Sequence, residues 1–266
     1  MKRCLLLLLF FLPLALFGVT EFVVIIPSFN NEKHVLDNID SLRMQTYPHW
    51  KAVYIDDCST DNTGELVEHY VKAMGLSKKF KIVHNRENAG SMANCYKWIQ
   101  RQEPNRVIVH LDGDDRLAHY KVLERLAAVY SDPNVWVTYG NFTTEPEGYP
   151  YRSEALPKEV IAKNSFRKYH WVTSHLKTYY AKLFHLIDRE YFFYKDAFVP
   201  MAQDQAIMLP ILELASLGHI RFIDEVLYVY NHTNPINDEK RDKSLGLDVV
   251  KTLREKKPLK PLQTLF

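Results

Sequence analysis

Short apolar runs alternate with segments of helical spacing through the first half of this 266-residue chain. Phe22–Ile26 is a continuous β-branched and aromatic run, which is typical of a strand buried on both faces. Similar runs occur before Asp57, before Asn85 and before Asp112. This alternation predicts an α/β fold with a Rossmann-type, mainly parallel sheet that is flanked by helices.

A polar stretch follows each of these predicted strands. The stretches read PSFNNE, DDCSTD, HNRENAG and DGDD in chain order. Because parallel strands end at one edge of a sheet, these sequence-distant loops are expected to converge there, where ligands bind in open sheets. Pro27 has no N–H to donate to a ladder, and it is expected to end the first strand.

The second half of the chain is less regular. Residues 135–142 have the pattern of a strand, and residues 202–215 that of an apolar helix. Loop and helix are expected over 166–187, a last strand pair over 221–235, and one amphipathic helix in the tail. No linker divides the chain, so we predict a single domain over 21–266. Its parts are a first half (21–130), a smaller mixed region (131–237) and a basic tail (238–266).

The first twenty residues differ from the rest. A basic start, Lys2 and Arg3, precedes an apolar run that is short for a membrane span and is interrupted by Pro13. The layout predicts a signal peptide or an N-terminal hydrophobic anchor over residues 1–20. The expected location is the secretory pathway or a membrane, to which this segment would attach the protein. A location on the cytosolic face of the membrane is an alternative.

Composition excludes several classes of protein. The three cysteines provide neither a disulfide scaffold nor a zinc motif. A formal net charge of +2 gives no electrostatic reason to expect nucleic acid as a partner. Neither a G-x-G-x-x-G loop after the first strand nor a P-loop motif is present, which argues against dinucleotide oxidoreductases and P-loop NTPases.

The DGDD stretch places Asp112, Asp114 and Asp115 on a turn around Gly113, which permits a tight or left-handed backbone. Asp112 and Asp114 can converge on a hard cation such as Mg²⁺ or Mn²⁺, with diphosphate oxygens completing the shell. The alternative is an acidic turn that caps the next helix. Asp115 is expected only to support the turn or cap that helix. An EF-hand is excluded, because Arg116 stands where an oxygen ligand belongs.

The DDCSTD stretch has both a structural and a functional interpretation. Asp61 or Thr63 suits the start of the following helix. Capping does not explain the pair Asp56 and Asp57 at the end of an apolar strand. A carboxylate there could accept hydrogen bonds from a base or a ribose.

VVIIPSFNNE, YIDDCSTDN and HLDGDD, in this order, resemble the family 2 glycosyltransferases of the GT-A fold. The resemblance covers nearly all of the chain after the leader. It implies a GT-A-like fold whose first half binds a nucleotide-sugar and whose mixed region binds the acceptor. Phe29 stands at the family's usual Tyr position, where the side chain packs on the base. The residues implied to bind the donor are Pro27, Phe29, Asn30, Glu32, Asp57, Asp112 and Gly113.

The same resemblance implies roles in the second half of the chain. Asp204, at the start of an apolar helix, corresponds to the family's base, although Gln203 replaces the usual Glu before it. Asp114 and Asp112 would bind Mn²⁺ or Mg²⁺, with His232 as a further candidate ligand. Ser174 and His175 would line the acceptor cleft. Alternatively, Asp204 is only an acid at the start of a helix, and His232 is a loop residue without a ligand. Ser174 and His175 would then take part only in ordinary packing.

The sequence therefore predicts a metal-assisted, inverting glycosyltransferase. The donor is expected to be a nucleotide-sugar, with a UDP-sugar as first choice, and the acceptor a glycan, a lipid or a protein. One alternative is a nucleotidyltransferase, which can share the sheet and the paired acids. Another is a catalytically inactive sugar-nucleotide or carbohydrate-binding module, for which Gln203 is the sequence support.

Overall fold

The computed structural model describes residues 18–151, 153–235, 240 and 242–266. Most of the predicted leader, residues 1–17, lies outside the described residues. Among the residues that are described, no helix is long and apolar enough to cross a membrane. The signal peptide or anchor therefore stays a prediction.

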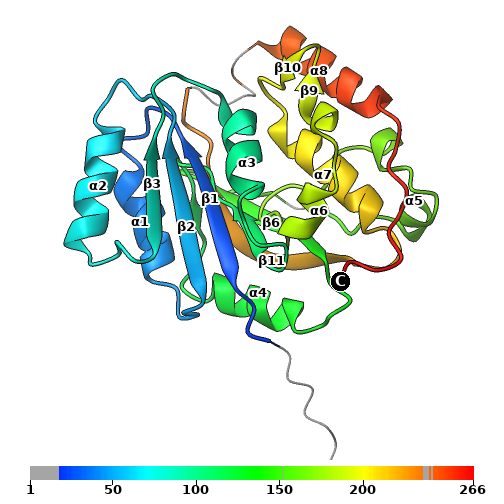
Figure 1. Ribbon diagram of the computed structural model, residues 1–266, viewed down its shortest axis with the longest axis horizontal. Helices are drawn as coiled ribbons and strands as arrows, with labels where there is room; N and C mark the ends of the chain where they lie inside the picture. The colour runs from blue at the N-terminus through cyan, green and yellow to red at the C-terminus, as the bar shows by residue number, and fades with distance from the viewer. Residues whose placement is uncertain (1–17, 152, 236–239, 241) are drawn as a thin grey trace, which may run out of the picture.

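Four parallel strands form the first half of the main sheet, in the order β3-β2-β1-β4. They are β1 (Phe22–Ser28), β2 (Trp50–Asp56), β3 (Phe80–His84) and β4 (Val107–His110). The helices of this half are α1 (Val35–Arg43), α2 (Thr63–Ala73), α3 (Ser91–Ile99) and α4 (Val122–Tyr130). The predicted alternation of strand and helix is confirmed, and Figure 1 shows the sheet between its helices.

Pro27 does not end β1, contrary to the prediction. The strand continues to Ser28, which pairs with Asp56 of β2. On the other side, the ladder between β1 and β4 stops at Ile25, so a residue without an N–H is tolerated beyond that point. The carbonyl of Pro27 instead accepts a hydrogen bond from the N–H of Gly113, at 3.0 Å.

The second half of the chain extends the same sheet. β8 (Thr178–Tyr180) is antiparallel to β4 and to β6 (Val137–Glu145), and β11 (Ile220–Asn231) is parallel to β6. The short strands β5 (Arg116–Leu117) and β7 (Pro150–Tyr151) pair with β11 and β6. The predicted last strand pair is wrong, because β11 is one strand whose register shifts around Val226. Such a bulge keeps a strand continuous across an irregular stretch.

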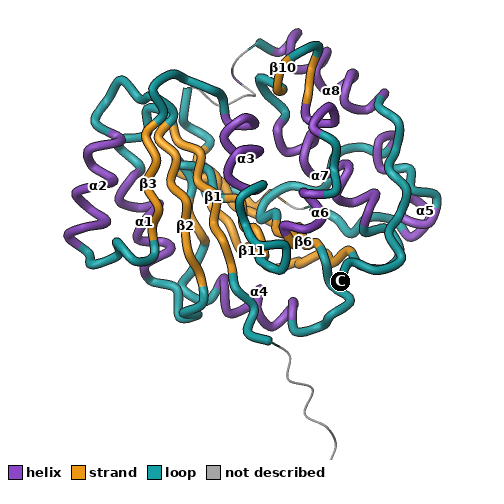
Figure 2. Tube along the Cα trace, viewed as in Figure 1, coloured by secondary structure: helices purple, strands orange, loops and turns teal. Residues whose placement is uncertain are grey.

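The remaining elements lie over one side of this sheet, as Figure 2 shows. They are α5 (Lys158–Ala162), α6 (Ala181–His185), α7 (Gln203–Leu214), α8 (Lys243–Glu255), two 3-10 helices (Phe166–Lys168 and Arg189–Phe192) and a small hairpin of β9 (Phe193–Tyr194) and β10 (Ala197–Phe198). The predicted apolar helix and the predicted tail helix are both present. The boundaries proposed between the parts of the chain remain a prediction, while strands from both halves share one sheet.

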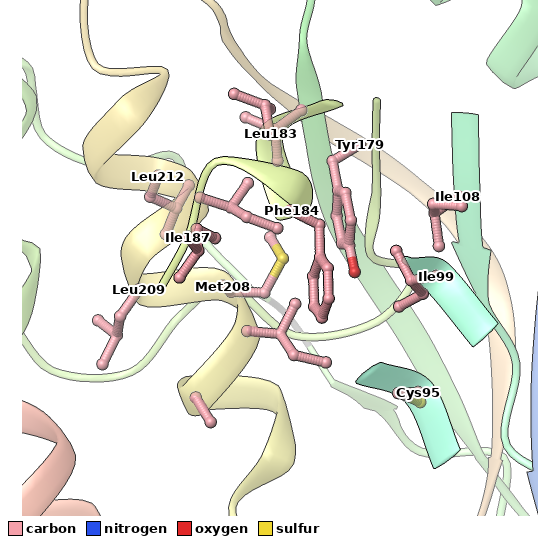
Figure 3. Packing of buried hydrophobic residues seen from close by; sticks show 14 of the residues in the cluster. Cys95, Ile99, Ile108, Tyr179, Leu183, Phe184, Ile187, Met208, Leu209 and Leu212 are labelled. Carbon is pink, nitrogen blue, oxygen red and sulfur yellow. The ribbon is translucent and has the colours of Figure 1, made fainter. Parts of the chain in front are cut away.

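Side chains that alternate along β1 feed two separate cores. Val24 and Ile26 pack with α1, α2 and α4, whereas Val23 and Ile25 pack with α3, α6 and α7. Figure 3 shows the second core, in which Cys95 and Ile99 of α3 belong to one cluster with Phe184 of α6 and Met208 of α7. The layers follow from the period-2 pattern of the buried strand.

A buried ion pair fixes helix α7. The guanidinium of Arg167 forms a two-point contact with Glu213, at 2.6 and 2.9 Å, and it also donates to the carbonyl of Leu253 in α8 at 2.6 Å. Two parallel hydrogen bonds hold both partners in one orientation. The first turn of α7, which carries Asp204, is therefore part of a helix with a fixed position.

Candidate active site

The polar strand ends converge at one edge of the sheet, as predicted. The N–H of Asp57 donates to the carbonyl of Ser28 at 2.8 Å, and the N–H of Asn85 donates to that of Asp56 at 2.9 Å. The bond from Gly113 to Pro27 adds the DGDD turn. Main-chain hydrogen bonds thus connect all four polar loops at the carboxyl ends of β1 to β4.

Asp57 organises the loop between β3 and α3. Its buried carboxylate accepts hydrogen bonds from the N–H groups of Ala89 and Gly90, at 2.9 and 2.8 Å, and from the side-chain amide of Asn85 at 2.7 Å. Both carboxylate oxygens therefore already have protein partners. The predicted contact of Asp57 with a base stays a prediction, and the structure adds a role in holding the loop.

The predicted donor residues of the PSFNNE loop are locked to the DDCSTD loop. Asn30, with a φ of 53°, accepts a hydrogen bond on Oδ1 from the N–H of Thr60 at 2.8 Å. Glu32 Oε2 accepts one from the N–H of Asn62 at 3.0 Å. Phe29 is partly buried on the same loop. A left-handed asparagine is the least costly non-glycine residue here, so the conformation suits the sequence.

The N-cap of α2 is Asn62, so the predicted N-cap at Asp61 or Thr63 is wrong by one residue, although Asp61 contacts the start of the helix. Asp61 Oδ1 accepts hydrogen bonds from the N–H and the hydroxyl of Thr63, at 3.0 and 2.6 Å, where α2 begins. Its Oδ2 accepts from the N–H of Glu32 at 3.1 Å. Asp61 therefore stabilises the first residue of α2 and connects the helix to the neighbouring loop.

Asp115 has a larger structural role than the sequence indicated. Its carboxylate accepts hydrogen bonds from the hydroxyl of Tyr228 and from the N–H of Asn231, both at 2.6 Å. Burial, with the negative charges of Asp114 and Asp112, raises the pKa of this carboxyl well above its ordinary value. Asp115 thus anchors the end of β11 to the DGDD turn.

Asp114 and Asp112 remain as the acids that could hold a cation. Asp114 Oδ2 accepts a hydrogen bond from the side chain of Asn234 at 2.7 Å, and burial raises the pKa of Asp114. Carboxylate oxygens suit a hard divalent cation, whose charge would offset the cost of a desolvated carboxylate, so the donor set fits Mn²⁺ or Mg²⁺. The two aspartates alone cannot complete a shell, and the other ligands would come from diphosphate oxygens or water.

His232 lies two residues before Asn234, which bonds to Asp114. It is exposed on the turn after β11, where its N–H donates to the carbonyl of Glu145 at 3.2 Å. Among the described residues, no group of three His, Cys, Asp or Glu side chains is arranged to hold a metal. A ligand role for His232 stays a prediction.

Gly113 is required by close contact rather than by a left-handed backbone. A Cβ at this position would lie 2.4 Å from Ser28 Oγ and 2.5 Å from Ser28 Cβ. We expect Gly113→Ala to lower the free energy of unfolding by about 1–3 kcal/mol, because the turn would have to move away from β1. Chemical denaturation measures this loss. Gly246→Ala, which would meet only the flexible end of Met201, is the matched control, and an equal loss in both variants would contradict the contact argument.

Asp204 lies in the first turn of α7, behind the left-handed Ala202, and it is partly buried. The amide of the adjacent Gln203 donates to Cys95 Sγ at 3.4 Å. Burial raises the pKa of the Cys95 thiol, and the negative charge of Asp112 contributes to that rise. Cys95 is therefore next to the start of α7, while a common location of the predicted base and the predicted cation site stays a prediction.

The predicted acceptor residues lie behind the DGDD turn. The His175 ring stacks on Tyr228 with 4.4 Å between centroids, and Tyr228 Oη accepts a hydrogen bond from the N–H of Asp112 at 3.2 Å. Ser174 is partly buried beside it. A role of this pair in binding an acceptor stays a prediction, while His175 packs against the support of the turn.

The sequence analysis missed the residues that complete this site from far along the chain. They are Asn38, Tyr228 and Asn234. Asn38 donates to the carbonyls of Asp112 and Asp115, at 2.9 and 2.8 Å, and Asn234 bonds to Asp114. The one local signal was the polar stretch NHTNP directly after an apolar strand, which is the same pattern that marked the first-half loops.

Comparisons with known proteins agree with this geometry. The model of the family described as Glycosyl transferase family 2 matches residues 23–193. A putative teichuronic acid biosynthesis glycosyltransferase, TuaG of Bacillus subtilis, is 32% identical over 103 residues, which is 39% of each chain. The poly(ribitol-phosphate) beta-N-acetylglucosaminyltransferase TarS of Staphylococcus aureus is 31% identical over 97 residues, 36% of this chain and 16% of TarS. The matched part thus spans well under half of these relatives.

Solved structures show the same fold. S. aureus TarS 1-349 in complex with UDP-GlcNAc has a TM-score of 0.62 at 18% identity, covering 88% of this chain and 66% of that one. The mannosyltransferase PcManGT from Pyrobaculum calidifontis, in complex with GDP-Man and Mn²⁺, has a TM-score of 0.63 at 16% identity, covering 91% and 67%. The fold is therefore GT-A. Since the family model covers more than half of the sequence, this chain belongs to glycosyl transferase family 2.

Proposed function

We propose that this glycosyltransferase moves a sugar from a nucleotide-diphosphate donor, with a UDP-sugar as first choice, to an acceptor hydroxyl. The transfer inverts the anomeric centre, and a divalent cation assists it. The observation that carries the proposal is the hydrogen bond from Gln203, beside Asp204, to Cys95, whose thiol pKa the negative charge of Asp112 helps to raise. A base and an acidic turn around one centre are the parts that such a transfer needs.

Each group has one task in the proposed reaction. The acceptor oxygen forms a bond to the anomeric carbon while the bond from that carbon to the diphosphate oxygen breaks. The electron pair of the broken bond stays on the departing nucleoside diphosphate, and the acceptor proton moves to the carboxylate of Asp204. Asp112 and Asp114 would hold Mn²⁺ or Mg²⁺, which neutralises negative charge on the diphosphate when it is bound.

Membership of glycosyl transferase family 2 argues against the nucleotidyltransferase alternative. One second candidate function remains. Gln203 stands where the family usually has a Glu, and its buried Oε1 has no hydrogen-bond partner among the described residues. This substitution favours a binding module that holds sugar nucleotides without turnover. The acceptor class, a glycan, a lipid or a protein, and a secretory or membrane location through the leader are further parts of the proposal.

A panel of sugar nucleotides tests the donor site. We expect at least one UDP-sugar to raise the thermal midpoint in the presence of Mn²⁺, with a smaller rise when EDTA replaces the metal, because ligands that bind the native state stabilise it. Turnover of that donor should then be measured by release of the nucleoside diphosphate. Stabilisation without release would favour the binding module, and a protein that no sugar nucleotide stabilises would contradict the donor site.

A further inference from the structure

Lys177 is a buried lysine next to the proposed site. The residue is 5% exposed and directly precedes β8. Its carbonyl accepts a hydrogen bond from the N–H of His110 at 3.2 Å, two residues before Asp112. The main chain thus fixes Lys177 beside the strand that leads into the DGDD turn.

The amine of Lys177 has little compensation within the protein. In the part of the chain that the structure describes, Nζ has one hydrogen bond, to His175 Nδ1 at 3.3 Å, and no ion pair. Removing an ammonium group from water costs several kcal/mol unless a negative charge or several acceptors replace the water. A buried lysine with a single imidazole partner therefore indicates an anion that binds nearby.

The neighbours of this amine locate that anion. The positive charge of Lys177 lowers the pKa of the Cys95 thiol, and the negative charge of Asp112 raises it. Cys95 also accepts the hydrogen bond from Gln203, and it lies one turn before Ile99 on α3 (Figure 3). Lys177 thus belongs to the same neighbourhood as the acidic turn and the start of α7.

The imidazole beside Lys177 is a suitable acceptor for its amine. Burial, followed by the positive charges nearby, lowers the pKa of His175 well below its ordinary value. A neutral ring can accept a hydrogen bond from an ammonium group on Nδ1. Its stacking on Tyr228 holds the ring in place, so His175 orients the lysine and adds no positive charge of its own.

We propose that Lys177 binds the diphosphate of the donor and stabilises the charge that develops on it as the sugar leaves. The inference rests on the proposed function, since the bond that breaks would lie between the acidic turn and Asp204. When that bond breaks, the electron pair stays on the diphosphate oxygen. A fixed ammonium group in a dry site stabilises such a charge without reorganisation. Lys177 is then a binding residue that supplements the cation.

The competing explanation is purely structural. Lys177 could offset the summed negative charge of Asp112, Asp114 and Asp115 without touching a ligand. A structural lysine would alter stability and leave the affinity for phosphate groups unchanged. A lysine that binds diphosphate would alter affinity for nucleoside diphosphates much more than affinity for nucleosides.

The test compares Lys177→Met, Lys177→Gln and Lys177→Arg with the control Lys51→Met. Lys51 is an exposed lysine near the start of β2, at the end of the strand opposite to the polar loops. Calorimetry measures binding of UDP and GDP and of the matching nucleosides, with Mn²⁺ and with EDTA. For the nucleoside diphosphate that the wild type binds, we expect the neutral variants to lose about 10- to 100-fold in affinity, as for a charged hydrogen bond. The nucleoside should change less than about twofold, while Lys177→Arg keeps most of the affinity.

Three results would overturn the inference, and they are distinguishable. Unchanged diphosphate affinity in both neutral variants, with wild-type binding intact, removes Lys177 from the site and leaves the proposed function standing. An equal loss for diphosphate and nucleoside assigns Lys177 a structural role. A wild type that binds neither UDP nor GDP overturns the proposed function itself, and with it the role of Lys177. Thermal melts of each variant confirm that the folded protein is being measured.

Discussion

Asp204→Asn is expected to lower kcat for sugar transfer by about 10²- to 10⁴-fold, because the amide cannot take the proton of the acceptor hydroxyl. Donor binding and the thermal midpoint should change little, since Asp204 is only partly buried at the start of α7 and the ion pair of Arg167 with Glu213 holds that helix elsewhere. The measurements are initial rates at saturating donor and acceptor, with calorimetry for the nucleotide. A fall in kcat with unchanged nucleotide affinity would identify the base.

Asp196→Asn provides the matched control for this variant. Asp196 is an exposed acid in the turn between β9 and β10, so the same change of charge and shape is made away from the predicted base. Wild-type rates in Asp196→Asn are expected. If Asp204→Asn also keeps the wild-type kcat, another group accepts the proton and the role assigned to Asp204 is wrong.

The first four strands could be predicted because their signal is local. Phe22–Ile26 is apolar on both faces, and each similar run ends in polar residues. Both features are visible in the sequence without knowledge of which distant residues the strands contact. β8 was not predicted, since Thr178–Tyr180 is a three-residue strand inside an aromatic segment. Its conformation depends on pairing with β4 and β6, and that pairing is a tertiary property.

The same distinction applies to the candidate site. The convergence of the polar loops followed from the geometry of parallel strands, without knowledge of any contact. The partners of the acids could not be derived in that way. Tyr228 and Asn234 lie more than a hundred residues from Asp115 and Asp114, so their contacts exist only after β11 has joined the sheet. The sequence therefore predicts only a turn or capping role for Asp115, although its carboxylate holds the end of that strand.

Asp114→Ala is expected to abolish metal-dependent turnover, with a fall of at least about 10²-fold at any Mn²⁺ concentration tested, because the variant loses an anionic oxygen ligand of the cation. The fold should persist. Burial raises the pKa of Asp114, so the ionised carboxylate costs free energy in the folded protein, and removing it offsets the lost hydrogen bond from Asn234. The thermal midpoint without metal is thus expected to stay close to that of the wild type.

The decisive measurement for Asp114→Ala is the dependence of turnover and of UDP affinity on Mn²⁺, compared with Asp37→Ala. Asp37 is an exposed acid on α1, and its removal should leave both dependences unchanged. In Asp114→Ala, Mn²⁺ should no longer strengthen UDP binding, whereas in the wild type it should. An Asp114→Ala protein with the wild-type Mn²⁺ dependence would show that the cation binds elsewhere. The raised pKa of the carboxyl would then reflect burial alone, and the acidic turn would serve chiefly to hold β11 through Asp115.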